Sequence, residues 1–408
     1  SEYILNVCGF LIIAGVILDK LGVRFSGVLS AGLMVLGAAI KFVGISEWFQ
    51  ATAFAGWLDS WWVEMPASAK MASLGFMIFG CGCAMAGTTD SKALAKWFKG
   101  KSMALAMGLQ LAIARLGTAL ALILSPILVS AKPAGSFYTL QETARPAFAA
   151  LVLLLAGTIL WAVFVAMDAR FDSKSGTTDK KETSEEDKFK FSDIFKVLGN
   201  KYFIMSALLC VFFYCSIISF KKFATSILIP RFDLPAESAS LMVSLIPFST
   251  VIFAPLFGSL VDRVGKGTRW MIAGSVLVFI AHIIIAFAPE GVSGFGYAGI
   301  AILGVGYSIV PAALWPTVSK IVPEKNLGTA YSLIYWIQNM GMMIVPIFIG
   351  RIFKNTITES GNALQEVSAA IQAEYVFVLL GIVSIVVAIL LSVSSRRHPE
   401  LCLEDPAV

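Results

Sequence analysis

The chain has 408 residues, of which 58% are hydrophobic and 14% are charged, and its formal net charge is +5. Soluble domains carry roughly 25% charged residues, so this composition argues against a water-soluble enzyme. The two histidines and six cysteines show no spacing typical of a metal site, and we expect neither a metal nor a cofactor. The basic residues are scattered between apolar runs, so nucleic acid is not an expected partner.

Apolar runs of membrane-spanning length follow one another along the chain. A helix needs about 20 mostly apolar residues to cross a bilayer. Eleven segments approach this length, at residues 3–18, 25–45, 71–92, 103–130, 147–167, 202–229, 239–261, 270–288, 295–319, 328–350 and 374–394. Lipid cannot satisfy open backbone groups, and the runs are too long for barrel strands. We therefore predict an all-α membrane protein.

A charged segment divides the chain in two. Residues 168–201 hold eight Lys/Arg and eight Asp/Glu, which is typical of a solvated connector. A short amphipathic helix is expected near residues 189–197. This predicts a first helical bundle at 1–167, a second at 202–395 and a tail at 396–408.

The two halves repeat one short loop. Residues 15–24 and 258–266 carry Gly, Asp, a basic residue and Gly at the same spacing, 243 positions apart. The second copy follows a complete apolar run that the first lacks, so we expect twelve spans in two six-helix halves, with this chain starting in the second span. The glycines permit a tight turn, and an aspartate there can accept N–H groups from another helix end. We expect a gate built from Asp19, Lys20, Gly22, Arg24, Asp262, Arg263, Gly265 and Lys266.

Basic residues set the expected orientation. The loops that carry the repeated motif also hold the larger share of lysine and arginine, so they and the connector should face the cytoplasm. The chain contains no Asn-x-Ser/Thr acceptor site, which favours a bacterial plasma membrane over the alternative, a lysosomal membrane. We expect a monomer, and the sequence leaves open whether it has an accessory subunit.

The paired loops, the central connector and the two-half arrangement resemble the major facilitator superfamily. The resemblance implies two pseudo-symmetric six-helix bundles, with the family's gate carboxylate at Asp19 and Asp262. A narrower likeness to the lysosomal dipeptide-transporter branch rests on residues 97–101, 108–117, 313–316, 322–331 and 337–339. That branch implies transport of small peptides as a uniporter.

Arg115 is the most informative single residue. It lies about twelve residues, or roughly 18 Å, inside its apolar run, where a charge costs at least about 2.5 to 3.5 kcal/mol. Every Asp and Glu is expected in a loop, in a tail or at the end of a span, so none would neutralise it in mid-membrane. A guanidinium binds a carboxylate with two parallel hydrogen bonds, and the dipeptide branch implies this role for Arg115. A structural ion pair, with an acid from a preceding helix, is the alternative.

Further polar and aromatic residues within the spans complete the expected substrate site: Gln110, Tyr214, Lys222, Tyr307, Trp315, Gln338 and Asn339. Lys221 and Lys222 can instead extend outward to the interface, and His282 is expected to be packed or bonded to backbone. The chain departs from the branch at Phe76 and Ala84, where the family pattern has a basic and an acidic residue. Either the substrate lacks a required ammonium or another acceptor replaces the acid.

Three functions remain open at this stage. The first is a dipeptide uniporter, and the second is a carrier of organic anions or phosphate-bearing solutes. The third is a receptor or scaffold that binds without transport. No titratable group is expected in the translocation path, so facilitated diffusion or exchange is favoured over proton coupling.

Overall fold

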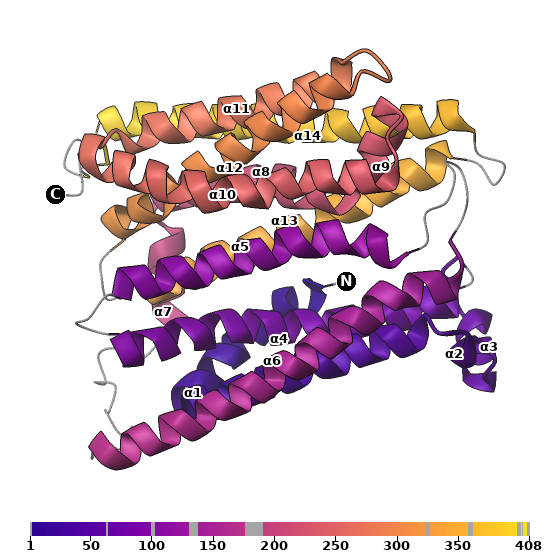
Figure 1. Cartoon of the computed structure of the whole chain (residues 1–408). Coiled ribbons are helices and arrows are strands. Elements are labelled where there is room, and N and C mark those ends of the chain that lie inside the picture. The colour runs from indigo at the N-terminus through magenta and orange to yellow at the C-terminus, as the bar shows by residue number, and fades with distance from the viewer. Residues whose placement is uncertain are drawn as a thin grey trace. The chain divides into compact units, whose positions relative to one another are not determined.

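A computed structural model describes residues 2–62, 64–98, 103–129, 138–175, 191–322, 327–357, 362–397, 401 and 403–405. Within these ranges every regular element is a helix (Figure 1). Nine of the described helices are long and apolar enough to cross a membrane, and Ala112–Leu128 is a shorter apolar helix. The prediction of an all-α protein with several membrane spans is confirmed.

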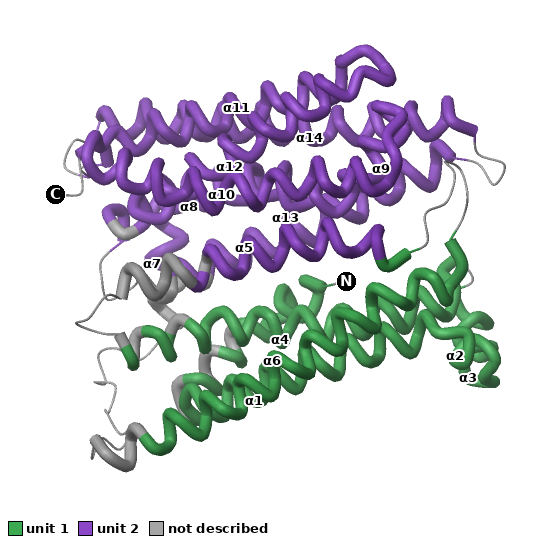
Figure 2. The backbone as a smooth tube through the Cα atoms, viewed as in Figure 1, with its two compact units in different colours: residues 1–107, 128–188 green, residues 108–127, 189–408 purple. Residues whose placement is uncertain are grey.

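Two compact units make up the chain (Figure 2). Unit 1 contains residues 1–107 and 128–188, and unit 2 contains residues 108–127 and 189–408. Most of the helix α5, Met103–Leu128, therefore belongs to unit 2, whereas the sequence-based boundary places it in the first half. The two six-helix halves stay a prediction.

Unit 1 is built on the pairing of two long helices. Its elements are the π-helical turn η1 (Asn6–Phe10), α1 (Leu11–Gly44), α2 (Glu47–Gln50), α3 (Ala53–Ser60), α4 (Ala67–Phe98) and α6 (Leu140–Ser175). A Cβ on Gly37 of α1 would lie 2.4 Å from the carbonyl oxygen of Gly75 in α4, and the reverse distance is also 2.4 Å. Small residues at such a crossing let membrane helices pack backbone to backbone.

Unit 2 has the larger buried core. It contains α7 (Phe191–Leu198), α8 (Lys201–Tyr214), the π-helical turn η3 (Cys215–Ser219), α9 (Phe220–Phe232), α10 (Ala236–Val264), α11 (Gly267–Phe287), α12 (Ser293–Ile321), α13 (Leu327–Thr356) and α14 (Ala363–Arg396). Phe203, Phe213, Phe220 and Phe377 are fully buried at its centre. Because α8, η3 and α9 run on without a break, they form one span with a local widening of the helix.

The connector differs in part from its prediction. Helix α6 continues to Ser175, so Asp168 lies within a helix and is fully buried, although the sequence places it at the start of a solvated segment. The short helix expected near residues 189–197 is α7, and this prediction is confirmed. Residues 176–190 of the predicted connector lie outside the described residues.

Candidate functional site

Tyr307 of α12 lies at the centre of a cationic and aromatic cluster in unit 2. Its ring is buried, with 2% of the residue exposed. The guanidinium carbon of Arg115, from α5, lies 5.2 Å from the ring centroid, and the Nζ of Lys221, from α9, lies 5.5 Å from it. Both distances fall within the range in which a cation is attracted to an aromatic ring. One tyrosine thus holds two positive side chains from two other helices.

Lys221 lies close after the π-helical turn η3. This residue is the second of α9 and is separated from η3 by Phe220, and such turns occur often at functional sites. Helix α13 approaches closely here, since a Cβ on Gly341 would lie 2.6 Å from Cys215 Sγ. Lys221 is half-buried against Tyr307, while Lys222 is exposed. The sequence favoured Lys222 as a substrate ligand, but it is Lys221 that lies on the cluster.

Neither cation of the cluster has a fixed acidic partner among the described residues. The described ion pairs within 4.0 Å are Arg24–Asp168, Arg231–Glu290 and His282–Glu374, and neither Arg115 nor Lys221 takes part in one. The cation–π attraction contributes about 0.5 to 2 kcal/mol per contact, which is less than the cost of placing a charge in the bilayer centre. An anionic ligand would supply the missing stabilisation.

Aromatic side chains surround the two cations. Tyr214, of which 7% is exposed, has its ring centroid 6.0 Å from that of Tyr307, in an edge-to-face arrangement. The ring centroid of Trp315 lies 5.1 Å from that of Tyr335 and 5.7 Å from that of Tyr331. The Tyr214 side chain in turn interacts electrostatically with Trp315 and with Tyr335. The structure therefore brings together three of the aromatic residues predicted from sequence, Tyr214, Tyr307 and Trp315.

The predicted amide ligands lie in different surroundings. Gln338 of α13 is 4% exposed, and its contacts are with sulfur: Cys210 Sγ lies 3.8 Å from Oε1, and Nε2 lies 3.9 Å from Met342 Sδ. Sulfur is a weak hydrogen-bonding partner, so this buried amide retains capacity for a ligand. Asn339 donates from Nδ2 to the carbonyl oxygen of Tyr335 at 2.9 Å, within its own helix. Gln110 is half-buried on α5.

The second copy of the repeated loop forms the turn between α10 and α11. Gly265 has φ +67° and Lys266 has φ +58°, so the chain reverses through two left-handed residues. The side chains of Asp262, Arg263 and Lys266 are exposed. Their role in a gate stays a prediction.

Residues of the C-terminal tail pack against this second loop. The Lys266 amide donates to the carbonyl oxygen of Glu404 at 2.7 Å, and Lys320 Nζ donates to that of Asp405 at 2.8 Å. Leu403 is 2% exposed and belongs to the core of unit 2. The described part of the tail is therefore integrated into the fold at the loop.

The first copy of the loop breaks α1. Gly22 has φ +77° and ψ 176°, a combination that is essentially restricted to glycine. The side chains of Asp19 and Lys20 lie outside what the structure describes. Arg24 follows the break and contacts α6: its Nε donates to Asp168 Oδ2 at 2.7 Å, and its Nη2 donates to the Asp168 carbonyl oxygen at 2.9 Å.

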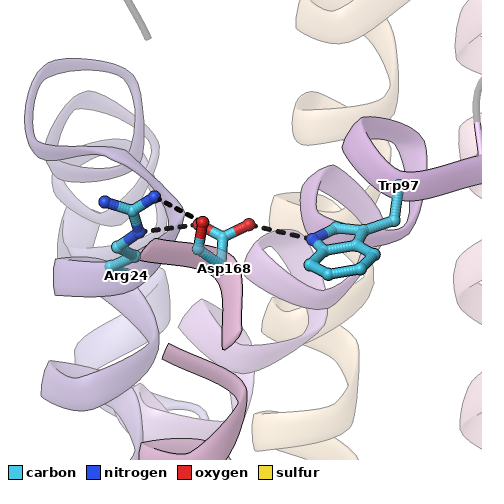
Figure 3. A network of polar contacts seen from close by, with 3 residues as sticks. All are labelled: Arg24, Trp97 and Asp168. Carbon is cyan, nitrogen blue, oxygen red and sulfur yellow. Dashed lines mark hydrogen bonds and ion pairs between the residues drawn. The ribbon is translucent and has the colours of Figure 1, made fainter. Parts of the chain in front are cut away.

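Asp168 joins three helices of unit 1. Figure 3 shows its carboxylate between Arg24 of α1 and Trp97 of α4, whose Nε1 donates to Oδ1 at 2.9 Å. Because both carboxylate oxygens accept hydrogen bonds, the burial of this charge is compensated. Sequence reasoning missed this residue, although the Arg24 that it binds belongs to the repeated motif.

One expectation about acidic residues is wrong. Glu374 does not lie at the outer end of a span, because α14 begins at Ala363 and the residue is fully buried within it. Its Oε2 lies 2.9 Å from Nδ1 of His282 in α11, which is also fully buried. His282 is therefore packed, as expected, but it is paired with an acid that the sequence reading had placed elsewhere. The acid does not neutralise Arg115.

Comparison with protein families and solved structures gives consistent matches. The family model described as Major Facilitator Superfamily matches residues 3–346 and 217–403. The crystal structure of a D-xylose–proton symporter has a TM-score of 0.63 at 13% identity, covering 96% of this chain and 85% of that one. A nucleoside transporter, NupG, has a TM-score of 0.59 at 15% identity, with coverages of 96% and 89%. At such identities the likeness concerns the fold alone.

Several curated relatives share one name. The lysosomal dipeptide transporter MFSD1 of Gallus gallus is 30% identical over 292 residues, which cover 69% of this chain and 62% of that protein. The protein of this name from Mus musculus is 26% identical over 347 residues, with coverages of 83% and 68%. The matched region thus spans less than two thirds of the chicken protein.

Proposed function

The chain belongs to the Major Facilitator Superfamily of membrane transporters, and from this premise we propose that it carries small peptides across a membrane. Alternating access would move the peptide, with the repeated loops at Gly22 and Gly265 as gate elements. The relatives named lysosomal dipeptide transporter support this substrate class. No covalent chemistry is part of the proposal.

Arg115 on the Tyr307 ring is the observation that carries the proposal. Its guanidinium belongs to the apolar part of α5, lies 5.2 Å from an aromatic ring centroid and takes part in no described ion pair. A planar guanidinium presents paired N–H donors that match a carboxylate. The free C-terminal carboxylate that every unblocked peptide carries is such a ligand, and it would satisfy Arg115 while the peptide is bound.

Counterflow in liposomes tests this function directly. Purified full-length protein is reconstituted with unlabelled Ala-Ala inside, and uptake of labelled Ala-Ala is followed. We expect transient accumulation by the unchanged protein and at least about a hundredfold loss of rate in Arg115→Gln, since a hydrogen-bonded charge pair contributes several kcal/mol. Arg351→Gln, which neutralises an exposed arginine on α13, should transport normally. Equal uptake by Arg115→Gln and Arg351→Gln would rule the proposal out.

The same liposomes separate the competing functions. A carrier of organic anions or phosphate-bearing solutes predicts counterflow of a labelled dicarboxylate but not of Ala-Ala. A receptor or scaffold predicts saturable binding of Ala-Ala with no flux. The proposal requires peptide flux in both directions across the membrane.

Uniport is the transport mode that we propose. The described acidic groups support it, because none forms an ion pair with Arg115 or Lys221 and the buried Glu374 is engaged by His282. We propose a bacterial plasma membrane as the location. Membrane fractionation of the source cells, probed with an antibody against the chain, tests that location.

A further inference from the structure

Lys221 is the unexplained group of the candidate site. A single peptide carboxylate accounts for Arg115, but a second cation lies on the same tyrosine ring. Arg115 Cζ lies 5.2 Å from the Tyr307 ring centroid and Lys221 Nζ lies 5.5 Å from it. The distance between the two cationic groups therefore cannot exceed the sum of these two distances. Two like charges at this range repel each other, and they do so more strongly in a low-dielectric interior than in water.

An outward-pointing lysine would avoid this repulsion. Lysines near the end of a span commonly extend their heads to the interface, and the adjacent Lys222 is exposed. Lys221 instead follows η3 and lies over a ring that is only 2% exposed. Its position is therefore set by the fold of unit 2 and keeps a second positive charge beside Arg115.

The described acidic residues offer no internal partner for this second charge. Glu374 is bonded to His282, and Glu290 lies at the edge of the ion-pair range of Arg231. In α4, Phe76 and Ala84 stand at the two charged positions of the dipeptide-branch pattern, and the Phe76 ring stacks on Phe79 at 5.8 Å. The chain thus has two cations suited to carboxylates and an alanine where that pattern has an acid.

We propose that Lys221 is a specificity-determining residue that binds a second carboxylate, so that the carrier prefers small peptides with an acidic side chain. This inference rests on the proposed function, in which Arg115 binds the C-terminal carboxylate. The side-chain carboxylate of the peptide then faces Lys221, and the peptide amino group needs no fixed acidic partner. The carrier therefore also binds peptides whose amino terminus is blocked.

Competition in the counterflow assay tests this specificity. Ala-Asp and its amide analogue Ala-Asn differ at one group, and each is used to inhibit labelled Ala-Ala uptake by full-length protein. We expect Ala-Asp to inhibit at a concentration at least about tenfold lower than Ala-Asn, because an ion-paired hydrogen bond is stronger than a neutral one. N-acetyl-Ala-Asp should compete within about threefold of Ala-Asp.

Substitution of Lys221 identifies the residue responsible. Lys221→Gln should abolish the difference between Ala-Asp and Ala-Asn, whereas Lys221→Arg should keep the preference. Lys354→Gln, which removes an exposed lysine of α13, is the matched control and should keep it as well. Size-exclusion profiles in detergent verify that each variant folds, and Lys221→Arg retains the charge if the glutamine variant does not fold.

The outcomes separate this inference from the proposed function. A single carboxylate shared by Arg115 and Lys221 is the competing arrangement, and it predicts equal inhibition by Ala-Asp and Ala-Asn. Equal inhibition, together with uptake that still depends on Arg115, would overturn the acidic-peptide preference but would not contradict peptide transport. Normal Ala-Ala uptake by Arg115→Gln would overturn the proposed function itself.

Discussion

His282 Nδ1 of α11 lies 2.9 Å from Glu374 Oε2 of α14, and both side chains are fully buried. The other polar atom of each, His282 Nε2 and Glu374 Oε1, has no hydrogen-bond partner among the described residues. The His282 ring also stacks on Phe377 at 5.3 Å and meets Phe220 edge-to-face at 5.2 Å. The pair therefore fixes the packing of α11 on α14 within an aromatic shell.

Removing one member of this pair should destabilise unit 2. Glu374→Leu leaves His282 buried without its partner, and breaking a buried pair in this way costs about 3 to 5 kcal/mol. Thermal unfolding in detergent measures the loss. Glu237→Leu, at an exposed first-turn position of α10, should cost less than about 1 kcal/mol.

The double variant His282→Phe with Glu374→Leu provides the second half of this test. Replacing a buried ionic pair by apolar groups is often neutral or stabilising, so the double variant should recover most of the stability. If the double variant is less stable than Glu374→Leu alone, the pair stabilises the fold by more than each group satisfying the other's buried polar atom.

The buried pair also bears on the mode of transport. Uniport predicts that an imposed pH gradient, inside alkaline, produces no accumulation of labelled Ala-Ala above its external concentration. The physical reason is that no described carboxylate forms an ion pair with Arg115 or Lys221, while Glu374 is engaged by His282. Gradient-driven accumulation that is lost in Glu374→Gln would contradict uniport and identify this pair as a proton-binding site.

Sequence patterns were sufficient to predict the helices but not to predict which side chains bind each other. Apolar runs identify spans because lipid exposure demands continuous hydrophobicity, and Arg115 stood out because charge is costly there. Glu374 was misplaced because the first part of α14 is polar, so the apolar run begins late. Its partner is 92 residues away, and that of Asp168 is 144 residues away. Contacts over such separations depend on tertiary packing, which spacing along one chain does not reveal.

The choice between two adjacent lysines illustrates the same limit. Lys221 and Lys222 are indistinguishable by composition, and helical periodicity alone does not say which one faces the core. The π-helical turn η3 adds a residue to the helix just before them and changes their direction. Gly341 of another helix, α13, packs against this turn, since a Cβ on it would lie 2.6 Å from Cys215 Sγ.

Asp168 should be the main polar contributor to the stability of unit 1. Asp168→Ala removes the acceptor of Arg24 and of Trp97, so we expect a loss of about 2 to 4 kcal/mol. Trp97→Phe removes one of these bonds and should cost about 1 kcal/mol. Chemical unfolding followed by tryptophan fluorescence measures the first variant, and thermal aggregation measures both. Equal losses in the two variants would mean that Arg24 contributes nothing to holding the carboxylate.

The tail should contribute to unit 2 through Leu403. This side chain is 2% exposed within the core, and truncating a buried leucine to alanine costs about 2 to 5 kcal/mol. Leu403→Ala should therefore lower the unfolding temperature in detergent. Leu364→Ala, at a position that is 75% exposed, should leave it within error. An unchanged temperature for Leu403→Ala would mean that the tail is not held against the loop at Gly265 in solution.

Glycine at the two loops should be required for backbone geometry. Gly22 has φ +77° with ψ 176°, so Gly22→Ala forces a Cβ into a region that costs about 1 to 3 kcal/mol. Gly32 lies on the same helix with open space around its Cβ position, and Gly32→Ala should be neutral or stabilising by up to about 1 kcal/mol. In unit 2, Gly265→Ala at φ +67° and Gly350→Ala, at a glycine of α13 with open space around its Cβ position, form the matching pair.

The two pairs together distinguish a structural turn from a gate. If the loops only connect helices, Gly22→Ala and Gly265→Ala lower thermal stability but leave the Ala-Ala counterflow rate per folded protein unchanged. If they belong to the gate, the rate falls as well, because the strained loop changes the balance between the two open states. We expect the rate to fall in both variants and to stay unchanged in Gly32→Ala and Gly350→Ala, measured on protein selected for correct folding by size exclusion.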